Sequence, residues 1–259
     1  MLISVRDISK SFGGVHALTG VSFDVPAGAI VGLIGPNGAG KTTLFNCISG
    51  FDDVDSGSVT VDGFGMKMGN WRSFYRAGVR RTFQNTSLFD DMTVLENLMV
   101  AKTSAAGTSF AAAGLGVLAA RASVRAREES VLLLKSMGQE HLAHTPCSQI
   151  TAGQRRTVEL TRLAASSPRI ALLDEPAAGL NPTETSELGH HVRRVRDLGI
   201  TVLVVEHDLR LVMNLSDHVV VLDRGTKIAE GPPHMIQRDP VVIESYLGVG
   251  RALGGQQQR

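Results

Sequence analysis

The feature that most constrains the fold of this chain is a glycine-rich loop at residues 35–42. It reads Gly-Pro-Asn-Gly-Ala-Gly-Lys-Thr, a complete G-x-x-x-x-G-K-[ST] pattern. The apolar run 29–34 precedes it like a buried strand, and residues 43–49 follow it like a helix that ends at Gly50. Glycines let the backbone turn its N–H groups toward an anion, and the N-terminus of the next helix adds positive dipole. The loop in this context predicts a nucleotide-binding α/β protein.

Two side chains of the loop have roles that follow from the pattern. Lys41 is expected to reach the β- and γ-phosphates, and the hydroxyl of Thr42 is expected to ligate Mg²⁺. The alternative is a chance match, and the residue frequencies of this chain give it a probability on the order of one per cent. The nucleotide contacts are therefore expected from the loop and the residue after it: Gly35, Pro36, Asn37, Gly38, Ala39, Gly40, Lys41, Thr42 and Thr43.

The composition limits the classes of protein to which the chain can belong. A chain of 259 residues forms one large domain or two small ones, and 43% hydrophobic with 20% charged residues is ordinary for a globular protein. With a net charge of +1, the chain lacks the excess of basic residues that is typical of nucleic-acid-binding proteins. Cys47 and Cys147 are far apart and in no metal spacing, so we expect two packing residues in a reducing compartment. We expect no signal peptide, and residues 105–120 are too short to span a bilayer.

The hydrophobic periodicity divides the rest of the chain. Val21, Phe23 and Val25 alternate with polar residues, and the first sixty residues read as short strands. Residues 94–138 have the composition of helices, and residues 168–205 return to a strand–helix–strand unit. Two segments of nucleotide core therefore flank a helical insertion of roughly 70 residues, as judged from periodicity alone.

The strand–helix–strand unit is the clearest secondary-structure pattern after the loop. Residues 170–173 and 200–205 read as buried strands that run parallel to each other. Between them, Asn181 is expected to cap a helix that has Pro182 at its first position. Gly199 is expected to end that helix.

Polar residues follow both of these strands. Asp174 and Glu175 come after the first strand, and His207 comes just after the second. In phosphate-loop enzymes the first acid binds Mg²⁺ directly or through water, and the next can polarise the attacking water. Ligands bind at this edge of an α/β sheet, so His207 is expected near the γ-phosphate. Without the glycine-rich loop these residues would read as solvated strand ends.

Several motifs occur in one order along the chain and carry a family resemblance. They are Phe12 ahead of Gly13-Gly14, the loop 35–42, TFQN (82–85), ITAGQRR (150–156), LLDEP (172–176), GLNP (179–182) and EHD (206–208). Over about residues 2–248 the chain resembles the ATP-binding subunit of an ABC transporter. The stretches 81–85, 88–97, 174–182 and 239–248 resemble the ATPases of branched-chain amino acid importers.

The resemblance implies a role for each candidate residue. Phe12 would stack on adenine, in contrast to the alternative role of a core strand residue. Gln84 would contact Mg²⁺ or the attacking water and would start a loop that senses the membrane subunit. Glu175 would be the catalytic base or water-polarising group, and His207 would contact the γ-phosphate. The implied cofactors are ATP and Mg²⁺, and the implied metal ligands are Thr42, Gln84 and Asp174.

One motif departs from the pattern of the family. Residues 150–154 occupy the place of the family's signature segment, which usually resembles Leu-Ser-Gly-Gly-Gln. The resemblance implies that two subunits close face to face, so that this segment of one contacts the ATP of the other. Thr151 keeps a hydroxyl for the γ-phosphate but adds a methyl group. Ala152 keeps its N–H but adopts glycine-only angles less readily. Gly153 and Gln154 are unchanged, so we expect a functional segment.

The resemblance also implies a fold and its division. The fold would be α/β, a P-loop ABC ATPase core with an N-terminal antiparallel β subdomain and a helical insertion subdomain. A single ATP-binding domain would cover residues 1–250 and leave a disordered tail at 251–259. The core with its β subdomain would occupy about residues 1–85 and 160–250, and the helical subdomain about residues 86–160.

The implied partners are a second ATP-binding subunit (identical or different), transmembrane permease subunits and, indirectly, a solute-binding protein, with no nucleic acid. The chain would lie peripherally on the cytoplasmic face of the inner membrane. The loop after Gln84 and the segment 88–97 would contact the permeases, since Leu88, Phe89 and Met92 look exposed there.

The function that the resemblance implies is the Mg²⁺-dependent, ATP-hydrolysing subunit of an importer for branched-chain amino acids or a related small polar solute. Three other functions remain open from the sequence. The nearest is an ATPase for another cargo, such as lipid or lipopolysaccharide export. A soluble ABC protein without transport is a second, but the chain has one cassette, no heptad run and no basic tail. A phosphate-loop kinase is a third, and it explains neither the signature segment nor Glu175. Neighbouring genes for two permeases, a binding protein and a second ATPase would favour the importer.

Overall fold

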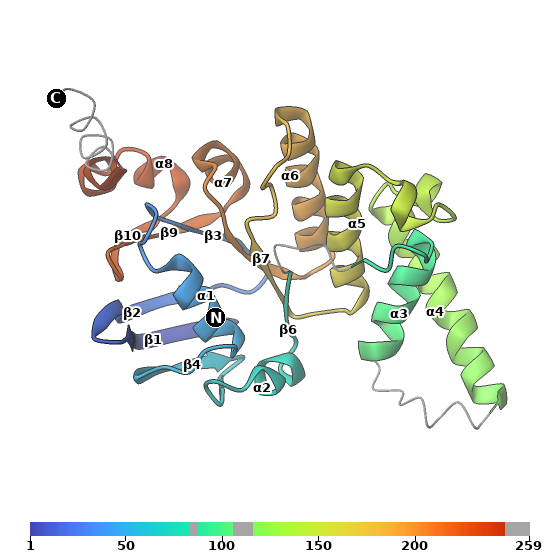
Figure 1. The fold of residues 1–259 in the computed structure, drawn as a ribbon, viewed down its shortest axis with the longest axis horizontal. Helices are drawn as coiled ribbons and strands as arrows, with labels where there is room; N and C mark the ends of the chain where they lie inside the picture. The colour runs from blue at the N-terminus through green and yellow to red at the C-terminus, as the bar shows by residue number, and fades with distance from the viewer. Residues whose placement is uncertain (83–87, 106–115, 247–259) are drawn as a thin grey trace.

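Two β-sheets form the frame of the molecule (Figure 1). The computed structural model describes residues 1–82, 88–105 and 116–246. The first sheet is antiparallel and has the strand order β2-β1-β4-β5. Its strands are β1 (Ile3–Phe12), β2 (Val15–Val25), β4 (Ser56–Val61) and β5 (Phe64–Gly65). The antiparallel N-terminal sheet is confirmed, and β1 and β2 are longer than the short strands that the sequence predicts.

The second sheet has six strands in the order β10-β9-β3-β8-β7-β6. Its strands are β3 (Ile30–Ile34), β6 (Val79–Arg81), β7 (Ile170–Asp174), β8 (Thr201–Val205), β9 (His218–Asp223) and β10 (Thr226–Gly231). All neighbours are parallel except β10, which pairs antiparallel with β9 at one edge. Val205 lies opposite both Leu33 and Asp174, so β3, β7 and β8 end at the same edge. The loops that follow these three strands therefore meet there.

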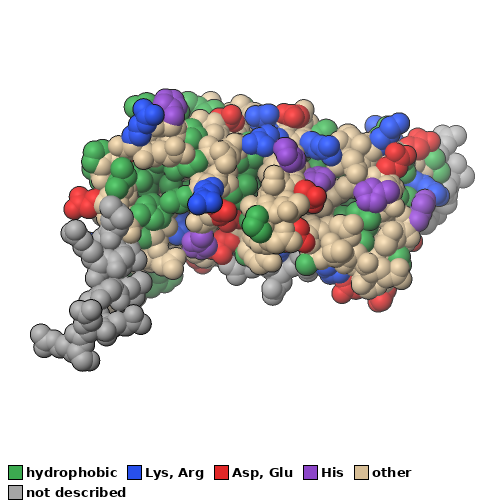
Figure 2. Space-filling view, turned by 90° about the horizontal axis from the view of Figure 1, so that it is seen from above, with side chains coloured by type: hydrophobic (Ala, Val, Ile, Leu, Met, Phe, Trp, Pro, Cys, Tyr) green, Lys and Arg blue, Asp and Glu red, His purple; other side chains and the backbone are tan. Residues whose placement is uncertain are grey.

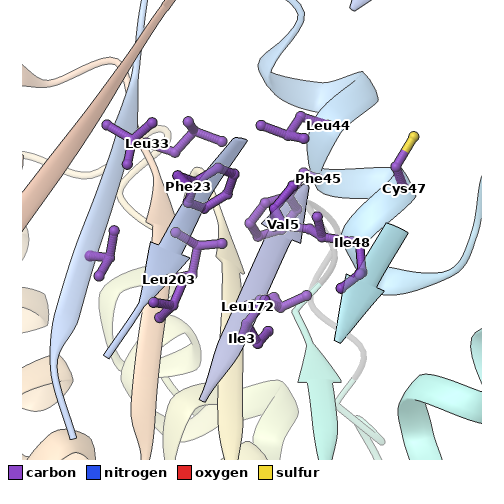
Figure 3. Close-up of a cluster of buried hydrophobic side chains, with 14 of the residues drawn as sticks. Ile3, Val5, Phe23, Leu33, Leu44, Phe45, Cys47, Ile48, Leu172 and Leu203 are labelled. Atoms are coloured by element: carbon purple, nitrogen blue, oxygen red, sulfur yellow. The ribbon is translucent and has the colours of Figure 1, made fainter. Parts of the chain in front are cut away.

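Helix α1 (Lys41–Ser49) lies between the two sheets and forms the centre of the main core (Figure 3). Leu44, Phe45 and Ile48 have no exposed surface. They pack against side chains of both sheets: Ile3, Val5, Phe23, Leu33, Leu172 and Leu203. Gly50 ends the helix with φ 75°, as expected from the sequence. Burial on both sides fixes the position of the helix, and with it the position of the loop at its N-terminus.

Three helices cover the opposite face of the parallel sheet: α5 (Ala152–Ala165), α6 (Pro182–Asp197) and α7 (Leu209–Leu215). Their apolar faces pack on Ala171, Leu173, Val202 and Val204, which alternate along β7 and β8 with the residues that face α1. The cap predicted at Asn181 is confirmed: its side chain accepts the N–H of Glu184, and the Glu184 carboxylate accepts the N–H of Asn181.

A group of helices stands beside the sheets, on the right of Figure 1. It contains α3 (Val94–Ala105) and α4 (Gly116–Ser136), which pack with the near end of α5 around Leu98, Leu134 and Val158. The short turns η2 (Glu140–Leu142) and η3 (Cys147–Gln149) connect α4 to α5. Because α5 also packs on α6, this helix joins the helical group to the sheet.

Three smaller elements complete the fold. Helix α2 (Trp71–Arg76) precedes β6, and α8 (Pro233–Ile236) with the helical residues 240–246 follows β10. Figure 2 shows hydrophobic side chains gathered over α7 and α8, with charged side chains of both signs scattered over the rest of that face. Within the described residues, no helix has both the length and the apolar character needed to cross a bilayer.

The α/β fold predicted from the sequence is confirmed, and the parallel pairing of β7 with β8 is confirmed with it. Both cysteines are buried and unpaired, and burial raises the pKa of the Cys47 thiol to about 12. The boundaries of the subdomains stay a prediction. Gln84 and the tail 251–259 lie outside the described residues.

Candidate functional site

The loop between β3 and α1 has a backbone that only glycine fits at two positions. Gly40 has φ 95°, and a Cβ there would lie 2.6 Å from the carbonyl oxygen of Ala17. A Cβ on Gly35 would lie 2.2 Å from the carbonyl oxygen of Leu222. Both neighbours are backbone atoms that cannot move aside, so the strands β2 and β9 hold the loop tightly. Two of the glycines in the pattern are thus required by close packing.

The N-terminus of α1 has the properties of an anion site. Gly40 at the N-cap has no side chain to accept the first N–H groups of the helix, and the first turn holds no acidic residue. Open N–H groups and the positive end of the helix dipole favour a bound phosphate. The hydroxyl-bearing Thr42 is exposed in this first turn. The loop therefore fits the phosphates of a nucleotide.

Lys41 lies beneath the loop. Its Nζ donates hydrogen bonds to the carbonyl oxygens of Gly35 (2.7 Å) and Pro36 (3.1 Å), and the residue is 6% exposed. Burial lowers the pKa of this ammonium group, and the nearby charge of Glu175 raises it. The sequence predicts a lysine directed at phosphate, and the structure shows its charge held by carbonyls of the same loop.

Asp174 ends β7 and is held by a buried ion pair. Its Oδ2 lies 2.7 Å from the Arg81 guanidinium, with the two side chains 6% and 9% exposed. The backbone N–H of Asp174 donates to the hydroxyl of Thr82 (3.3 Å). A carboxylate and the hydroxyl of Thr42 are oxygen ligands of the kind that Mg²⁺ takes. The residues described here thus fit the metal that the sequence predicts.

Glu175 and His207 lie in direct contact. Glu175 Oε1 and His207 Nε2 are 2.6 Å apart, so the ends of β7 and β8 meet through these two side chains. Glu175 has φ 46°, a left-handed backbone conformation that costs free energy outside glycine. Its N–H donates to the carbonyl oxygen of Val205, which holds the turn in place. The structure brings together the two residues that the sequence assigns to the γ-phosphate and the attacking water.

A buried carboxylate lies behind this pair. Glu206 is 4% exposed, and its oxygens accept the N–H groups of Ala177 (2.6 Å) and His207 (3.1 Å). Burial raises the pKa of Glu206, although both hydrogen bonds act in the other direction. This carboxylate joins the loop after Glu175 to the backbone of His207. Sequence reasoning missed the role, although an acid between a buried strand and a candidate histidine was a usable signal.

Phe12 is available for a ligand. It ends β1 and is 50% exposed, so the alternative role of a core residue is wrong. The ammonium of Lys10 lies 5.1 Å from the centre of its ring. Strand β2 of the same hairpin approaches the phosphate loop at Gly40. It also donates a backbone hydrogen bond to the carbonyl oxygen of Gly225, and the N–H of Gly225 donates to the carbonyl oxygen of Ala39 in the loop. The hairpin that carries Phe12 is therefore fixed to the loop.

The signature segment forms the start of α5. Thr151 is the N-cap: its hydroxyl accepts the N–H of Gln154 (3.2 Å), and the Gln154 side chain accepts the N–H of Thr151 (2.9 Å). Ala152 is the first residue of the helix and has no positive φ, so the expected cost of glycine-only angles is wrong. A Cβ on Gly153 would lie 2.7 Å from a carboxylate oxygen of Glu184. Since α1 and α5 cover opposite faces of the sheet, this segment and the phosphate loop are separate in one chain.

The segment 88–97 comprises the turn before α3 and the first four residues of that helix. Phe89 and Met92 are 46% and 38% exposed, as predicted, but Leu88 is 7% exposed, so its predicted exposure is wrong. Leu88 packs into the helical group, and the buried amide of Asn97 bonds the backbone of Phe89 on both sides. Packing against α3 thus removes one of the three apolar residues from the surface.

The comparisons with known proteins agree with this geometry. The family model described as "ABC transporter" matches residues 18–178, and the model described as "Branched-chain amino acid ATP-binding cassette transporter" matches residues 226–252. The chain is 41% identical to the high-affinity branched-chain amino acid transport ATP-binding protein BraF of Pseudomonas aeruginosa. That alignment covers 95% of this chain and 98% of BraF. It is 40% identical to LivG of Salmonella typhimurium, a protein of the same description, over the same shares.

Solved structures give the same result. An ATP-binding cassette of an ABC transporter in its ADP conformation matches with a TM-score of 0.80 and 32% identity, over 95% of this chain and 98% of that one. A nucleotide-free cassette matches with a TM-score of 0.78 at the same identity and coverage. With the phosphate loop, the acids after β7 and the histidine after β8 at one sheet edge, the chain belongs to the ABC transporter family, as an ATP-binding cassette.

Proposed function

We propose that this chain is the ATP-hydrolysing subunit of an importer for branched-chain amino acids. The observation that carries the proposal is the contact of Glu175 with His207 at the sheet edge that also holds the phosphate loop. A carboxylate held 2.6 Å from an imidazole is fixed in direction, and a fixed carboxylate can orient a water molecule for attack on phosphorus. The cargo is supported by the descriptions of BraF and LivG and by the matched C-terminal segment.

The residues around the loop divide the work of hydrolysis. The open N–H groups of α1 and the charge of Lys41 bind the phosphates, and Phe12 stacks on the base. Thr42, Asp174 and Gln84 would hold Mg²⁺, which would supply positive charge to neutralise the phosphates. Glu175 accepts a proton from the attacking water, while His207 donates to the γ-phosphate.

The second ATP-binding subunit completes each site. Thr151 and Gln154 lie on the face of the sheet opposite α1, so in one chain they are separated from the loop that holds ATP. In a face-to-face pair they serve the partner's ATP. Closure then assembles the site, and hydrolysis lets the pair reopen.

The permease pair binds at the outer side of β6 and the segment 88–97. A cavity of about 300 Å³ opens there, lined by apolar and basic side chains that include Tyr75, Arg80, Phe89 and Arg162. Asp90 in the same segment bonds Arg155 of α5 (2.6 Å), and Arg155 also donates to the carbonyl oxygen of Cys147. A partner seated here touches a segment that is tied to the signature helix. The chain is thereby held at the cytoplasmic face of the inner membrane, and a solute-binding protein delivers the cargo.

Transport in the parent organism tests cargo and chemistry together. Disruption of the gene should abolish uptake of labelled leucine, isoleucine and valine, and the wild-type gene should restore it. Glu175→Gln should keep ATP affinity but reduce turnover at least about 100-fold and fail to restore uptake. Phe89→Ser should keep the ATPase of the isolated subunit and lose uptake, since Phe89 lines the proposed permease cavity and belongs to none of the nucleotide-binding segments.

Three outcomes contradict parts of the proposal. Near wild-type turnover in Glu175→Gln would refute the catalytic assignment. Normal uptake of all three amino acids after disruption would refute the cargo and favour another ABC system, such as lipid or lipopolysaccharide export. Full uptake with Phe89→Ser would place the permeases elsewhere.

A further inference from the structure

Arg81 connects the end of β7 to helix α1. Its Nη2 donates to Asp174 Oδ2 (2.7 Å), and its Nη1 donates to Asn46 Oδ1 (2.7 Å) and to the hydroxyl of Ser49 (3.1 Å). The guanidinium lies 4.9 Å from the ring centre of Phe45. These contacts on a planar fork allow one orientation of the group.

The ion pair is removed from solvent. Arg81 and Asp174 are 9% and 6% exposed at their side chains. A buried carboxylate needs a partner, and a rigid donor fixes the direction in which its second oxygen points. Hydrogen bonds of this kind to a metal-binding carboxylate orient it before the metal arrives. The guanidinium engages Oδ2, so the orientation of Oδ1 follows from it.

We propose that Arg81 is a positioning residue for the metal-binding carboxylate of Asp174. It acts through Asp174 and has no contact of its own with the reacting atoms. The inference rests on the proposed role of Asp174 at Mg²⁺. Arg81 also lines two cavities on the outer side of β6, of about 300 and 200 Å³, the first of which is the proposed permease site. One side chain thus borders both the permease site and the carboxylate of the metal site.

The test measures how strongly Mg²⁺ increases the affinity for ATP. A fluorescent ATP analogue is titrated onto the isolated subunit in EDTA and over a series of Mg²⁺ concentrations. Arg81→Met should raise the Mg²⁺ concentration that gives half of the increase in ATP affinity by about 10- to 100-fold, because the Asp174 carboxylate loses its fixed direction. Affinity in EDTA should stay within about twofold, since the loop is untouched. Arg81→Lys keeps the positive charge but replaces the planar fork by one ammonium group. Its Mg²⁺ requirement should therefore lie between those of the wild type and Arg81→Met.

Arg80 gives a matched control. It is the adjacent arginine and borders the same cavities, but its guanidinium donates to the carbonyl oxygens of Tyr75 and Val79. Arg80→Met should leave the Mg²⁺ requirement unchanged. An equal shift in Arg80→Met would overturn the proposal, because it would show a general effect of removing an arginine from this strand.

The remaining outcomes are separate. If Asp174→Asn raises the Mg²⁺ requirement while both Arg81 variants match the wild type, the positioning role is refuted and the metal site stands. If Asp174→Asn leaves it unchanged, the proposed metal role of Asp174 is refuted. If thermal unfolding shows that Arg81→Met is not folded, an unchanged Mg²⁺ requirement in Arg81→Lys refutes the positioning role.

Discussion

The phosphate loop and the signature segment each present the N-terminus of a helix, but the two helices begin in different ways. Helix α1 begins at Gly40, whose missing side chain leaves the first N–H groups without a cap. Helix α5 begins at Thr151, whose hydroxyl accepts the N–H of Gln154 and whose own N–H donates to the Gln154 side chain, a complete capping box. One helix start is open to a ligand, and the other is satisfied by its own side chains.

This difference explains why one motif is complete and the other varies. The phosphate loop depends on glycines whose Cβ positions are filled by backbone carbonyls. The signature segment depends on a hydroxyl at the N-cap, which Thr151 supplies as serine would, and on a first helical residue with ordinary angles at Ala152. The altered residues of this chain thus fall where the backbone tolerates them.

The largest expected effect is at Lys41. Lys41→Ala should reduce affinity for labelled ATP at least about 100-fold, because a charge-assisted contact to phosphate is lost beside the open helix start. The fold should persist, since within the described part of the chain the ammonium of Lys41 bonds only the loop carbonyls of Gly35 and Pro36. The exposed Lys135→Ala is the control and should bind ATP normally. Unchanged affinity in Lys41→Ala would show that the loop is not the nucleotide site.

A glycine in each segment gives the next comparison. Gly40→Ala forces a side chain into φ 95° and toward a backbone oxygen, so it should reduce ATP affinity at least about tenfold and stability by about 1–2 kcal/mol. Gly153→Ala meets Cγ, Cδ and Oε1 of Glu184, whose carboxylate must leave the capping box with Asn181, but alanine favours the helix, so stability should fall by no more than about 1 kcal/mol. Thermal unfolding and ATP titration measure both. Equal losses in the two variants would remove the distinction between the segments.

The smallest expected effect comes from restoring the usual signature. Thr151→Ser with Ala152→Gly should change the ATPase of the isolated chain less than about threefold, because the cap and the backbone angles are already in place. Steady-state hydrolysis measures it. A large increase in the isolated chain, with little change in a mixed complex, would instead favour a heterodimer with an unaltered partner.

Local patterns in the sequence were sufficient for much of this structure. The strand before the phosphate loop, the strand–helix–strand unit with Asn181 and the acids after β7 each depend on neighbours a few residues away. The capping box at Thr151 was equally readable from the spacing to Gln154, since a threonine followed three residues later by glutamine is its usual pattern.

Contacts between distant residues were not predictable in this way. The pair Arg81–Asp174 spans 93 positions, and nothing around either residue indicates its partner. The burial of Leu88 depends on how α3 packs with α4 and α5, which periodicity does not specify. The two hydrogen bonds that the Glu206 carboxylate accepts likewise depend on where β8 ends relative to the loop after β7.

The position of α1 has a thermodynamic consequence for the whole chain. Because the helix is the shared inner surface of two sheets, neither sheet can unfold and leave the nucleotide loop intact (Figure 3). ATP that binds only the folded form then stabilises both sheets together, by about 1.4 kcal/mol for each tenfold rise in free ligand above its dissociation constant. Bound ATP would thus raise the unfolding temperature of the entire cassette, including strands that it does not contact.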